Sequence, residues 1–160
     1  MPTGHVYSKL TRLISRLSRQ WSTDNFEPHV TLLGSLLDSE EAILSRTSQL
    51  APCIKPYEIK LTTVDYLDEF FRCLFFKVET TESVMDANLK ARSFFQRRRD
   101  PKHRPHLSLM YGNLAPAAKE KIVAKIAHES HWQFEVRTIH VYSTTGKPRD
   151  WFRVREFALK

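Results

Sequence analysis

Two short segments of this 160-residue chain repeat a pattern that joins an imidazole to a hydroxyl group. Pro28-His29-Val30-Thr31-Leu32 and Pro105-His106-Leu107-Ser108-Leu109 both read proline, histidine, an apolar residue, serine or threonine, and another apolar residue. Only about 0.01 copies of this pattern are expected if residues of this composition are placed at random. The repetition predicts that the two segments serve one shared function.

Alternate side chains of a β-strand point to opposite faces, so His29 and Thr31 project together, as do His106 and Ser108. If the two strands lie side by side, we expect two imidazoles and two hydroxyls to meet in one cleft. A neutral histidine can take a proton from water while a protonated histidine gives one to a leaving oxygen. The hydroxyls can donate hydrogen bonds to oxygens on which negative charge develops. This set suits phosphodiester cleavage without a metal ion.

The elements around the two motifs repeat in one order: helix, histidine strand, helix, strand, strand. The first half predicts a helix over 9–20, a strand over 29–34, a helix over 39–50, and strands over 57–62 and 70–78. The second half predicts a helix over 82–97, a strand over 106–111, a helix over 116–129, and strands from 134 and over 151–158. No linker rich in proline, glycine and serine separates the halves, so they share one core.

We therefore predict an α+β fold and a single, duplicated domain over residues 1–160. Its two pseudo-symmetric lobes cover approximately 9–78 and 82–159, each an antiparallel sheet flanked by helices, with a central cleft between them. Aromatic residues recur in the strand over 70–78, where Phe75 shares a face with Phe71. That face either packs in the core or lines the cleft, and Phe75 is kept as a candidate for stacking on substrate.

Composition narrows the class of protein. With 25 Lys+Arg against 18 Asp+Glu, the net charge of +7 favours anionic partners such as phosphates or nucleic acid. A basic run, either a substrate-facing loop or a solvated one, precedes the second motif: Arg97, Arg98, Arg99, Lys102, His103 and Arg104. No apolar run reaches the ~20 residues of a membrane span, and the first residues do not resemble a signal peptide. We expect a cytoplasmic monomer.

The remaining candidate ligands do not form a metal site in the sequence. Two cysteines are too few for a disulfide framework or a four-cysteine zinc site. Outside the two motifs and the basic run, the histidines that lack a paired motif and metal-ligand spacing are His5, His128, His131 and His140. We expect neither a metal nor a cofactor.

The paired motifs resemble those of the 2H phosphoesterase superfamily, and they are most similar to the small plant and fungal cyclic nucleotide phosphodiesterases. The resemblance implies hydrolysis of nucleoside 2',3'-cyclic phosphates to 2'-phosphates, of ADP-ribose 1'',2''-cyclic phosphate, or of both. It implies that the catalytic set is His29, Thr31, His106 and Ser108. It also implies that His106 is the base that activates water and His29 the acid. Tyr111, just after the second motif, matches a position that lies against the substrate.

This sequence departs from the family pattern at its N-terminus. Plant members carry a tryptophan there, in a first strand, that helps to hold the base of the substrate. The matching stretch here, Val6-Tyr7-Ser8-Lys9-Leu10, has none. Two alternative functions stay open. One is an RNA-end phosphodiesterase or 2'-5' RNA ligase-like enzyme that acts on oligonucleotides. The other is a non-catalytic nucleotide- or RNA-binding module, although binding alone does not require both a base and an acid.

Overall fold

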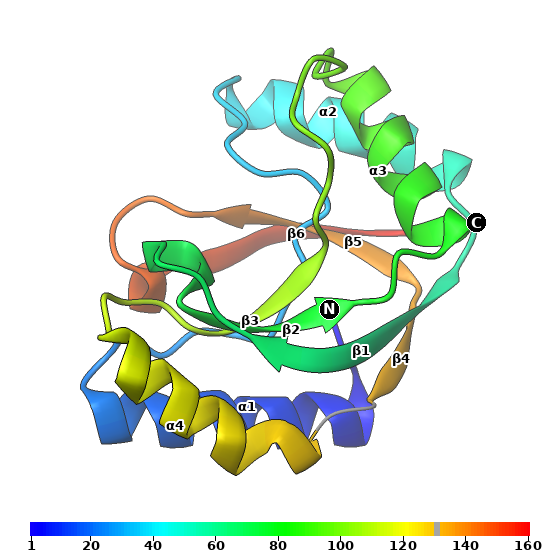
Figure 1. Cartoon of the computed structure of the whole chain (residues 1–160). Coiled ribbons are helices and arrows are strands. Elements are labelled where there is room, and N and C mark those ends of the chain that lie inside the picture. Colours follow the sequence, from blue (N-terminus) through cyan, green and yellow to red (C-terminus); the bar gives the residue numbers. More distant parts are fainter. Residues whose placement is uncertain (130–131) are drawn as a thin grey trace.

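The computed structural model describes residues 1–129 and 132–160. Along the chain, two helices and two strands are followed by a helix, a strand, a helix and three strands (Figure 1). The helices are α1 (Gly4–Trp21), α2 (Glu40–Leu50), α3 (Glu82–Phe94) and α4 (Pro116–Ile126). The strands are β1 (Tyr57–Asp65), β2 (Leu74–Val78), β3 (His106–Met110), β4 (Gln133–Val136), β5 (Thr138–Ser143) and β6 (Phe152–Ala158). No helix in the described part of the chain is long and apolar enough to cross a bilayer.

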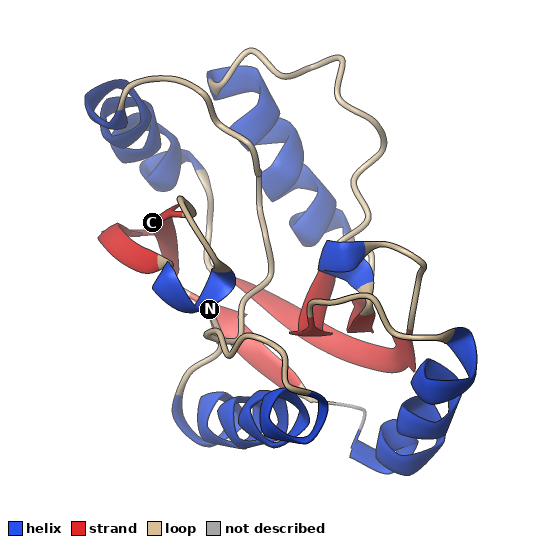
Figure 2. Ribbon diagram, turned by 90° about the vertical axis from the view of Figure 1, so that its left-hand side faces the viewer, coloured by secondary structure: helices blue, strands red, loops and turns tan. Residues whose placement is uncertain are grey.

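Two antiparallel sheets carry the strands. One has the order β3-β2-β1-β4, and the other is the hairpin β5-β6. Helices α1 and α4 cover one side of the four-stranded sheet, while α2 and α3 lie together on the opposite side of the molecule (Figures 1 and 2). The predicted α+β class, with antiparallel sheets flanked by helices, is confirmed. Strand β3 pairs with β2, so the second half completes a sheet that the first half began.

The four-stranded sheet and α1 form much of the core. One stripe of α1, made of Leu10, Leu13, Ile14 and Leu17, is at most 3% exposed. Leu107 and Leu109 of β3 belong to the same buried cluster. Since alternate residues of a strand face opposite ways, burial of these leucines directs His106 and Ser108 to the other face of β3. Hydrophobic packing thus aims the polar half of the second motif.

The first histidine motif does not form the strand predicted over 29–34. Only Val30 makes a bridge, to Leu107 of β3. The residues after it leave the strand direction, and the side chain of Asn88 on α3 donates a hydrogen bond to the carbonyl oxygen of Leu32 at 2.6 Å. A side chain therefore binds a carbonyl that would otherwise be available to a neighbouring strand. Alternation of residue types did not reveal this because apolar side chains also cover the core outside regular strands.

The strand predicted over 70–78 begins only at Leu74, because Phe70–Arg72 forms a turn of 3-10 helix. The two bonds between the guanidinium of Arg72 and the carboxylate of Glu69, each 2.8 Å long, stabilise this turn. Lys119 of α4 lies buried beside it and donates to Asp68 at 2.6 Å. A buried ammonium group is tolerated here because it is paired and hydrogen-bonded. The turn is therefore held from both sides.

Other boundaries also differ from the predicted ones. Helix α1 begins at Gly4 rather than near residue 9, and the helix predicted over 82–97 ends at Phe94. The strand predicted from 134 is two strands, because after β4 the chain passes from the larger sheet into the hairpin. Every residue of β5 is partly buried, so no alternation of buried and exposed positions marks it. Strand β5 was not predicted as a separate strand, although polar and apolar residue types alternate at its start.

Candidate active site

The bridge between Val30 and Leu107 joins the centres of the two motifs in antiparallel sense. Residues flanking an antiparallel pair lie opposite one another, so His29 neighbours Ser108 and Thr31 neighbours His106. His106 and Ser108 lie on the face of β3 opposite to Leu107, and Thr31 lines the same cavity as His106. The structure thus brings the two imidazoles and the two hydroxyls together, as the repeated pattern predicts.

Each imidazole is oriented by a hydrogen bond from its Nδ1 to a backbone carbonyl oxygen. Nδ1 of His29 donates to the carbonyl oxygen of Glu27 at 2.7 Å, and Nδ1 of His106 donates to that of Arg104 at 2.9 Å. A carbonyl can only accept, so Nδ1 carries the proton in each ring. In both motifs the acceptor stands two residues before the histidine, with a proline between them. The backbone bond therefore leaves Nε2 of each ring without the proton and able to accept one.

The surroundings shift both histidines in the same direction. Burial lowers the pKa of His29, and the bond to the Glu27 carbonyl opposes this. Burial also lowers the pKa of His106, with a smaller contribution in the same direction from the positive charge of Arg72. Desolvation disfavours the charged imidazolium in each case. Both rings are therefore biased toward the neutral form that can accept a proton.

The two hydroxyls differ in exposure. Thr31 is exposed, whereas Ser108 is 4% exposed and donates to the carbonyl oxygen of Phe71 at 3.2 Å. Tyr111 completes this side, because its hydroxyl lies 3.4 Å from Nε2 of His29. Burial raises the pKa of Tyr111 to about 12, so its hydroxyl stays protonated at neutral pH and can donate. The structure therefore places Tyr111 directly beside one proposed catalytic ring.

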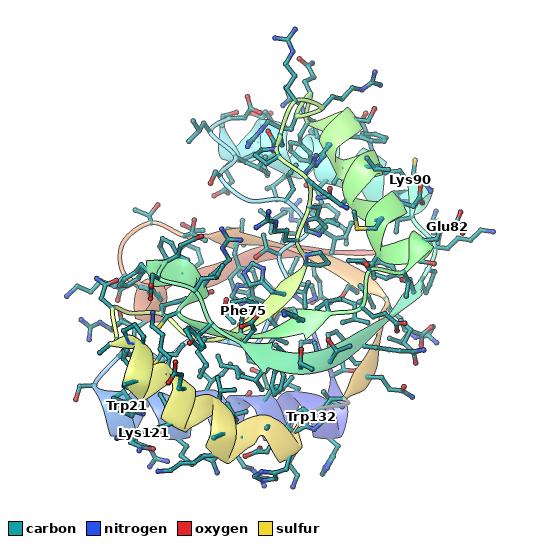
Figure 3. All side chains as sticks on the ribbon, viewed as in Figure 1. Trp21, Phe75, Glu82, Lys90, Lys121 and Trp132 are labelled. Atoms are coloured by element: carbon teal, nitrogen blue, oxygen red, sulfur yellow. The ribbon has the colours of Figure 1, made fainter. Side chains whose placement is uncertain are left out.

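Phe75 lies in the middle of the molecule, between the two helical layers (Figure 3). It stands opposite Ser108 in the strand register and is 7% exposed. Its ring meets that of His106 edge to face, with centroids 5.3 Å apart. This contact packs the Phe75 ring against the imidazole and leaves little of Phe75 accessible. Its role in binding substrate stays a prediction.

A more exposed aromatic group lies on the His29 side. Phe71 is 55% exposed, and its ring runs nearly parallel to that of Trp151, at 28° and 6.2 Å between centroids. Trp151 also lies 6.5 Å from the ring of His29 and 5.8 Å from that of Tyr111. These rings offer flat apolar surface next to an imidazole. Such surface suits a stacked heterocycle.

A cavity of about 480 Å³ lies on the other side, where Thr31 and His106 contribute to its wall. Helix α3 supplies Asn88 and Arg92 to the same wall. The rest comes from the ends of neighbouring segments: Leu32, Leu33, Gly34, Arg72, Asp100, Pro101, Lys102, His103 and Arg104. Half of the basic run therefore faces this cavity, and half does not.

The profile of the 2'-5' RNA ligase superfamily matches residues 8–148 of this sequence, which is most of the chain. The chain belongs to the 2'-5' RNA ligase superfamily. Its expected membership of the 2H phosphoesterases is thereby confirmed. A curated relative of this chain, the cyclic phosphodiesterase of Arabidopsis thaliana, is 25% identical over 125 residues. The match spans 78% of this chain and 69% of the plant protein.

Solved structures share the fold of this chain. The protein TT0787 of Thermus thermophilus superposes with a TM-score of 0.67 at 16% identity, over 96% of this chain and 91% of that one. E. coli LigT in its apo form gives a TM-score of 0.65 at 15% identity, over 95% and 91%. LigT complexed with 3'-AMP gives 0.62 at 14% identity, over 95% and 92%. At these identities the likeness concerns the fold.

Two aromatic residues beside His29, Phe71 and Trp151, were not among the predicted site residues. The sequence placed Phe71 on a strand face together with Phe75, but the residue lies in a turn that exposes its ring. Trp151 comes from the far end of the chain, and nothing in its local sequence connects it with His29. The only available signal was the Phe70-Phe71 doublet ahead of a buried strand, since large apolar side chains there are hard to bury together.

The remaining histidines of the described part of the chain have different surroundings. His103 lines the cavity. His140 lies on β5, where its Nε2 is 2.7 Å from the hydroxyl of Thr138. His131 falls outside the described residues. Within residues 1–129 and 132–160, no three histidine, cysteine or acidic side chains are grouped to hold a metal ion.

Proposed function

We propose that this protein is a metal-independent cyclic phosphodiesterase. Its substrates would be nucleoside 2',3'-cyclic phosphates, ADP-ribose 1'',2''-cyclic phosphate, or both. The observation that carries the proposal is the bridge from Val30 to Leu107, because it brings two imidazoles and two hydroxyls together. The similarity to a plant protein described as a cyclic phosphodiesterase supports the same reaction.

The reaction needs one base and one acid. His106, neutral with its lone pair on Nε2, accepts a proton from water as the water oxygen forms a bond to phosphorus. The bond from phosphorus to the 3'-oxygen of a nucleoside substrate breaks, and Nε2–H of protonated His29 gives that oxygen its proton. The product is a 2'-phosphate. Because the reaction leaves His106 protonated and His29 neutral, His106 then gives a proton to solvent and His29 takes one from it.

The hydroxyls and the neighbouring charges complete this scheme. Thr31 and Ser108 donate to the non-bridging oxygens, where negative charge increases in the transition state. Ser108 exchanges its bond to the Phe71 carbonyl for a bond to phosphate. The carboxylate of Glu27 favours the charged form of His29, and Arg72 disfavours that of His106. The charges around each ring have both signs, so the assignment of His29 as acid and His106 as base follows the family resemblance.

An RNA-end phosphodiesterase or ligase-like activity is the second candidate. The match to the 2'-5' RNA ligase superfamily over residues 8–148 favours it. Both candidates use the same group of side chains, and they differ in what extends from the cyclic phosphate. Both candidate functions require that the site binds a nucleotide. The LigT complex with 3'-AMP shows a protein of this fold with such a ligand.

A product assay tests the proposal. Adenosine 2',3'-cyclic phosphate, ADP-ribose 1'',2''-cyclic phosphate and a short RNA with a cyclic end are offered in parallel, and phosphorus NMR identifies the phosphomonoester formed. We expect a 2'-phosphate from the nucleotide. A single product from RNA alone would favour the second candidate. Binding of all three without any phosphomonoester would refute hydrolysis by either candidate and favour a binding module.

A further inference from the structure

The cavity beside His106 opens onto the proposed reaction centre, since Thr31 and His106 form part of its wall. Its volume of about 480 Å³ lies within the range typical of small-molecule sites. Its cationic side chains come from the turn before β2, from α3 and from the loop before β3: Arg72, Arg92, Lys102 and Arg104. It is placed to hold the part of a substrate next to the reacting phosphate.

Two of these cations have no carboxylate partner. Asp100 lines the cavity, but its carboxylate accepts from Nε of Arg97 at 2.8 Å. Lys102 and Arg104 make no ion pair with any residue that the structure describes, and both are exposed. Their charges therefore remain available to an anion that enters the cavity.

Arg92 adds a third charge and holds the loop. It donates from Nη1 to the carbonyl oxygen of Asp100 at 3.0 Å and from Nη2 to that of Pro101. Carbonyl dipoles bind the guanidinium without cancelling its unit charge. Its Nε is buried and has no hydrogen-bond partner among the described residues. The side of the cavity formed by α3 is therefore positively charged too.

His103 stands in this cationic setting. Burial, the charge of Arg92 and the nearby His106 lower the pKa of His103 to about 4, so it is neutral at physiological pH. A neutral imidazole still carries one N–H group, so His103 can donate a hydrogen bond to an anion in the cavity. A bound phosphate would also favour protonation of this ring.

The two flanks of the site differ in chemistry. Phe71 and Trp151 present aromatic surface on the His29 side. The His106 side presents the cations of the cavity. A substrate with a heterocycle at one end and further phosphate at the other would match this division. A simple nucleoside cyclic phosphate would leave the cationic side empty.

We propose that the cavity binds a second phosphate group of the substrate, next to the cyclic phosphate that is cleaved. The substrate class is then a cyclic phosphate that carries a pyrophosphate or a further phosphodiester. This inference rests on the proposed function for the identity of the reacting group. It assigns Lys102 and Arg104 to substrate selection, which the reaction itself does not require.

Steady-state kinetics on three substrates test the inference. Adenosine 2',3'-cyclic phosphate has no second phosphate. A dinucleotide ending in a 2',3'-cyclic phosphate adds a phosphodiester, and ADP-ribose 1'',2''-cyclic phosphate adds a pyrophosphate. The readout is the ratio of kcat/KM for each larger substrate to that for the nucleoside. We expect at least one ratio to exceed about 10, because charge-assisted hydrogen bonds to phosphate add binding energy. The larger ratio identifies the source of the phosphate.

The matched variants lie in one loop. K102Q/R104Q removes two charges from the cavity wall and should reduce that ratio about tenfold, mainly through KM. R98Q/R99Q removes two charges from the same basic run at positions that do not line the cavity. It should leave the ratio unchanged. Equal loss in both variants would mean that only the overall charge of the loop matters, and the inference would be wrong.

Binding of inorganic pyrophosphate, measured by calorimetry, separates this inference from the proposed function. If the wild type hydrolyses adenosine 2',3'-cyclic phosphate but every ratio stays near 1, the function stands and the second site is refuted. If no substrate is hydrolysed, the function fails. Weaker pyrophosphate binding by K102Q/R104Q than by R98Q/R99Q would then still support the site, while undetectable binding to the wild type would refute it.

Discussion

The carbonyl oxygen of Glu27 accepts a hydrogen bond from Nδ1 of His29 at 2.7 Å, and the carboxylate of the same residue is itself held in place. The hydroxyl of Tyr7 donates to it at 2.8 Å, and that of Tyr142 on β5 donates to its other oxygen. The second histidine has no such arrangement, because its carbonyl partner belongs to the basic residue Arg104. The two halves of the site are thus alike in backbone geometry, but the residue that supplies the carbonyl is acidic in one half and basic in the other.

Replacing this carboxylate should change how His29 titrates. In E27Q we expect the pKa of His29 to fall, because a negative charge that favours imidazolium is lost. The limb of the kcat/KM–pH profile that reports His29 should therefore move to lower pH. NMR titration of the imidazole measures the same shift directly. E135Q, with the same charge change on β4, is the control. An unchanged His29 titration in E27Q would show that the carboxylate has no such effect.

Each proposed catalytic histidine should be indispensable. H29A and H106A should each reduce kcat by roughly 10²- to 10⁴-fold, the usual loss on removing a general acid or base. Circular dichroism should show that both variants remain folded, since neither ring is part of the main apolar cluster. H128A, which changes an exposed histidine away from the site, should retain full activity. An active variant of either site histidine would contradict the two-histidine mechanism.

Rate should depend on pH as a bell-shaped curve with its maximum on the acidic side of neutrality. Burial lowers the pKa of both His29 and His106 from the ordinary value of about 6.5. The two limbs belong to the pair, because the groups interact. Initial rates from roughly pH 4 to pH 9 would define the curve. EDTA should leave it unchanged, since the imidazoles supply both proton transfers. A maximum in alkaline solution would contradict this scheme.

His103 should make the fold sensitive to acid. Its folded pKa of about 4 lies below that of the unfolded chain, about 6.5. The unfolded state therefore binds the proton more readily between these values, and stability falls as pH decreases through this window. H103Q removes this contribution, so its Tm should fall less than that of the wild type between neutral pH and about pH 4.5. Parallel losses of Tm in the two proteins would refute the assignment.

Phe71 should contribute to binding substrates that carry a base. F71A is expected to raise KM about tenfold for adenosine 2',3'-cyclic phosphate, because stacking of a base on an aromatic ring is a substantial part of such binding. The effect on kcat should be small, since the ring does not transfer protons. F152A removes another exposed phenylalanine, 59% exposed and adjacent to Trp151, and serves as the control. A lower kcat with unchanged KM in F71A would point to a structural role instead.

The repeated motifs could be recognised in the sequence because their chemistry is local. A proline, a histidine and a hydroxyl residue at fixed spacing define which side chains share a face, and the pairing of Val30 with Leu107 confirms that the motifs are adjacent. Apolar periodicity likewise located α2 and β3 to within about a residue or two of the predicted limits. The prediction of a strand over 29–34 was wrong, because a side chain of α3 binds the carbonyl of Leu32.

Residues of the site that are distant in sequence were decided by tertiary structure alone. Trp151 reaches His29 only because the chain end folds back beside the first motif. Likewise, the basic run is continuous in sequence, yet Lys102 and Arg104 line the cavity while Arg98 does not. Local spacing specifies which face a side chain occupies within its own strand or helix. Which side chains then meet across a cavity depends on how separate elements pack, because contacts between distant residues leave no periodic trace in either segment.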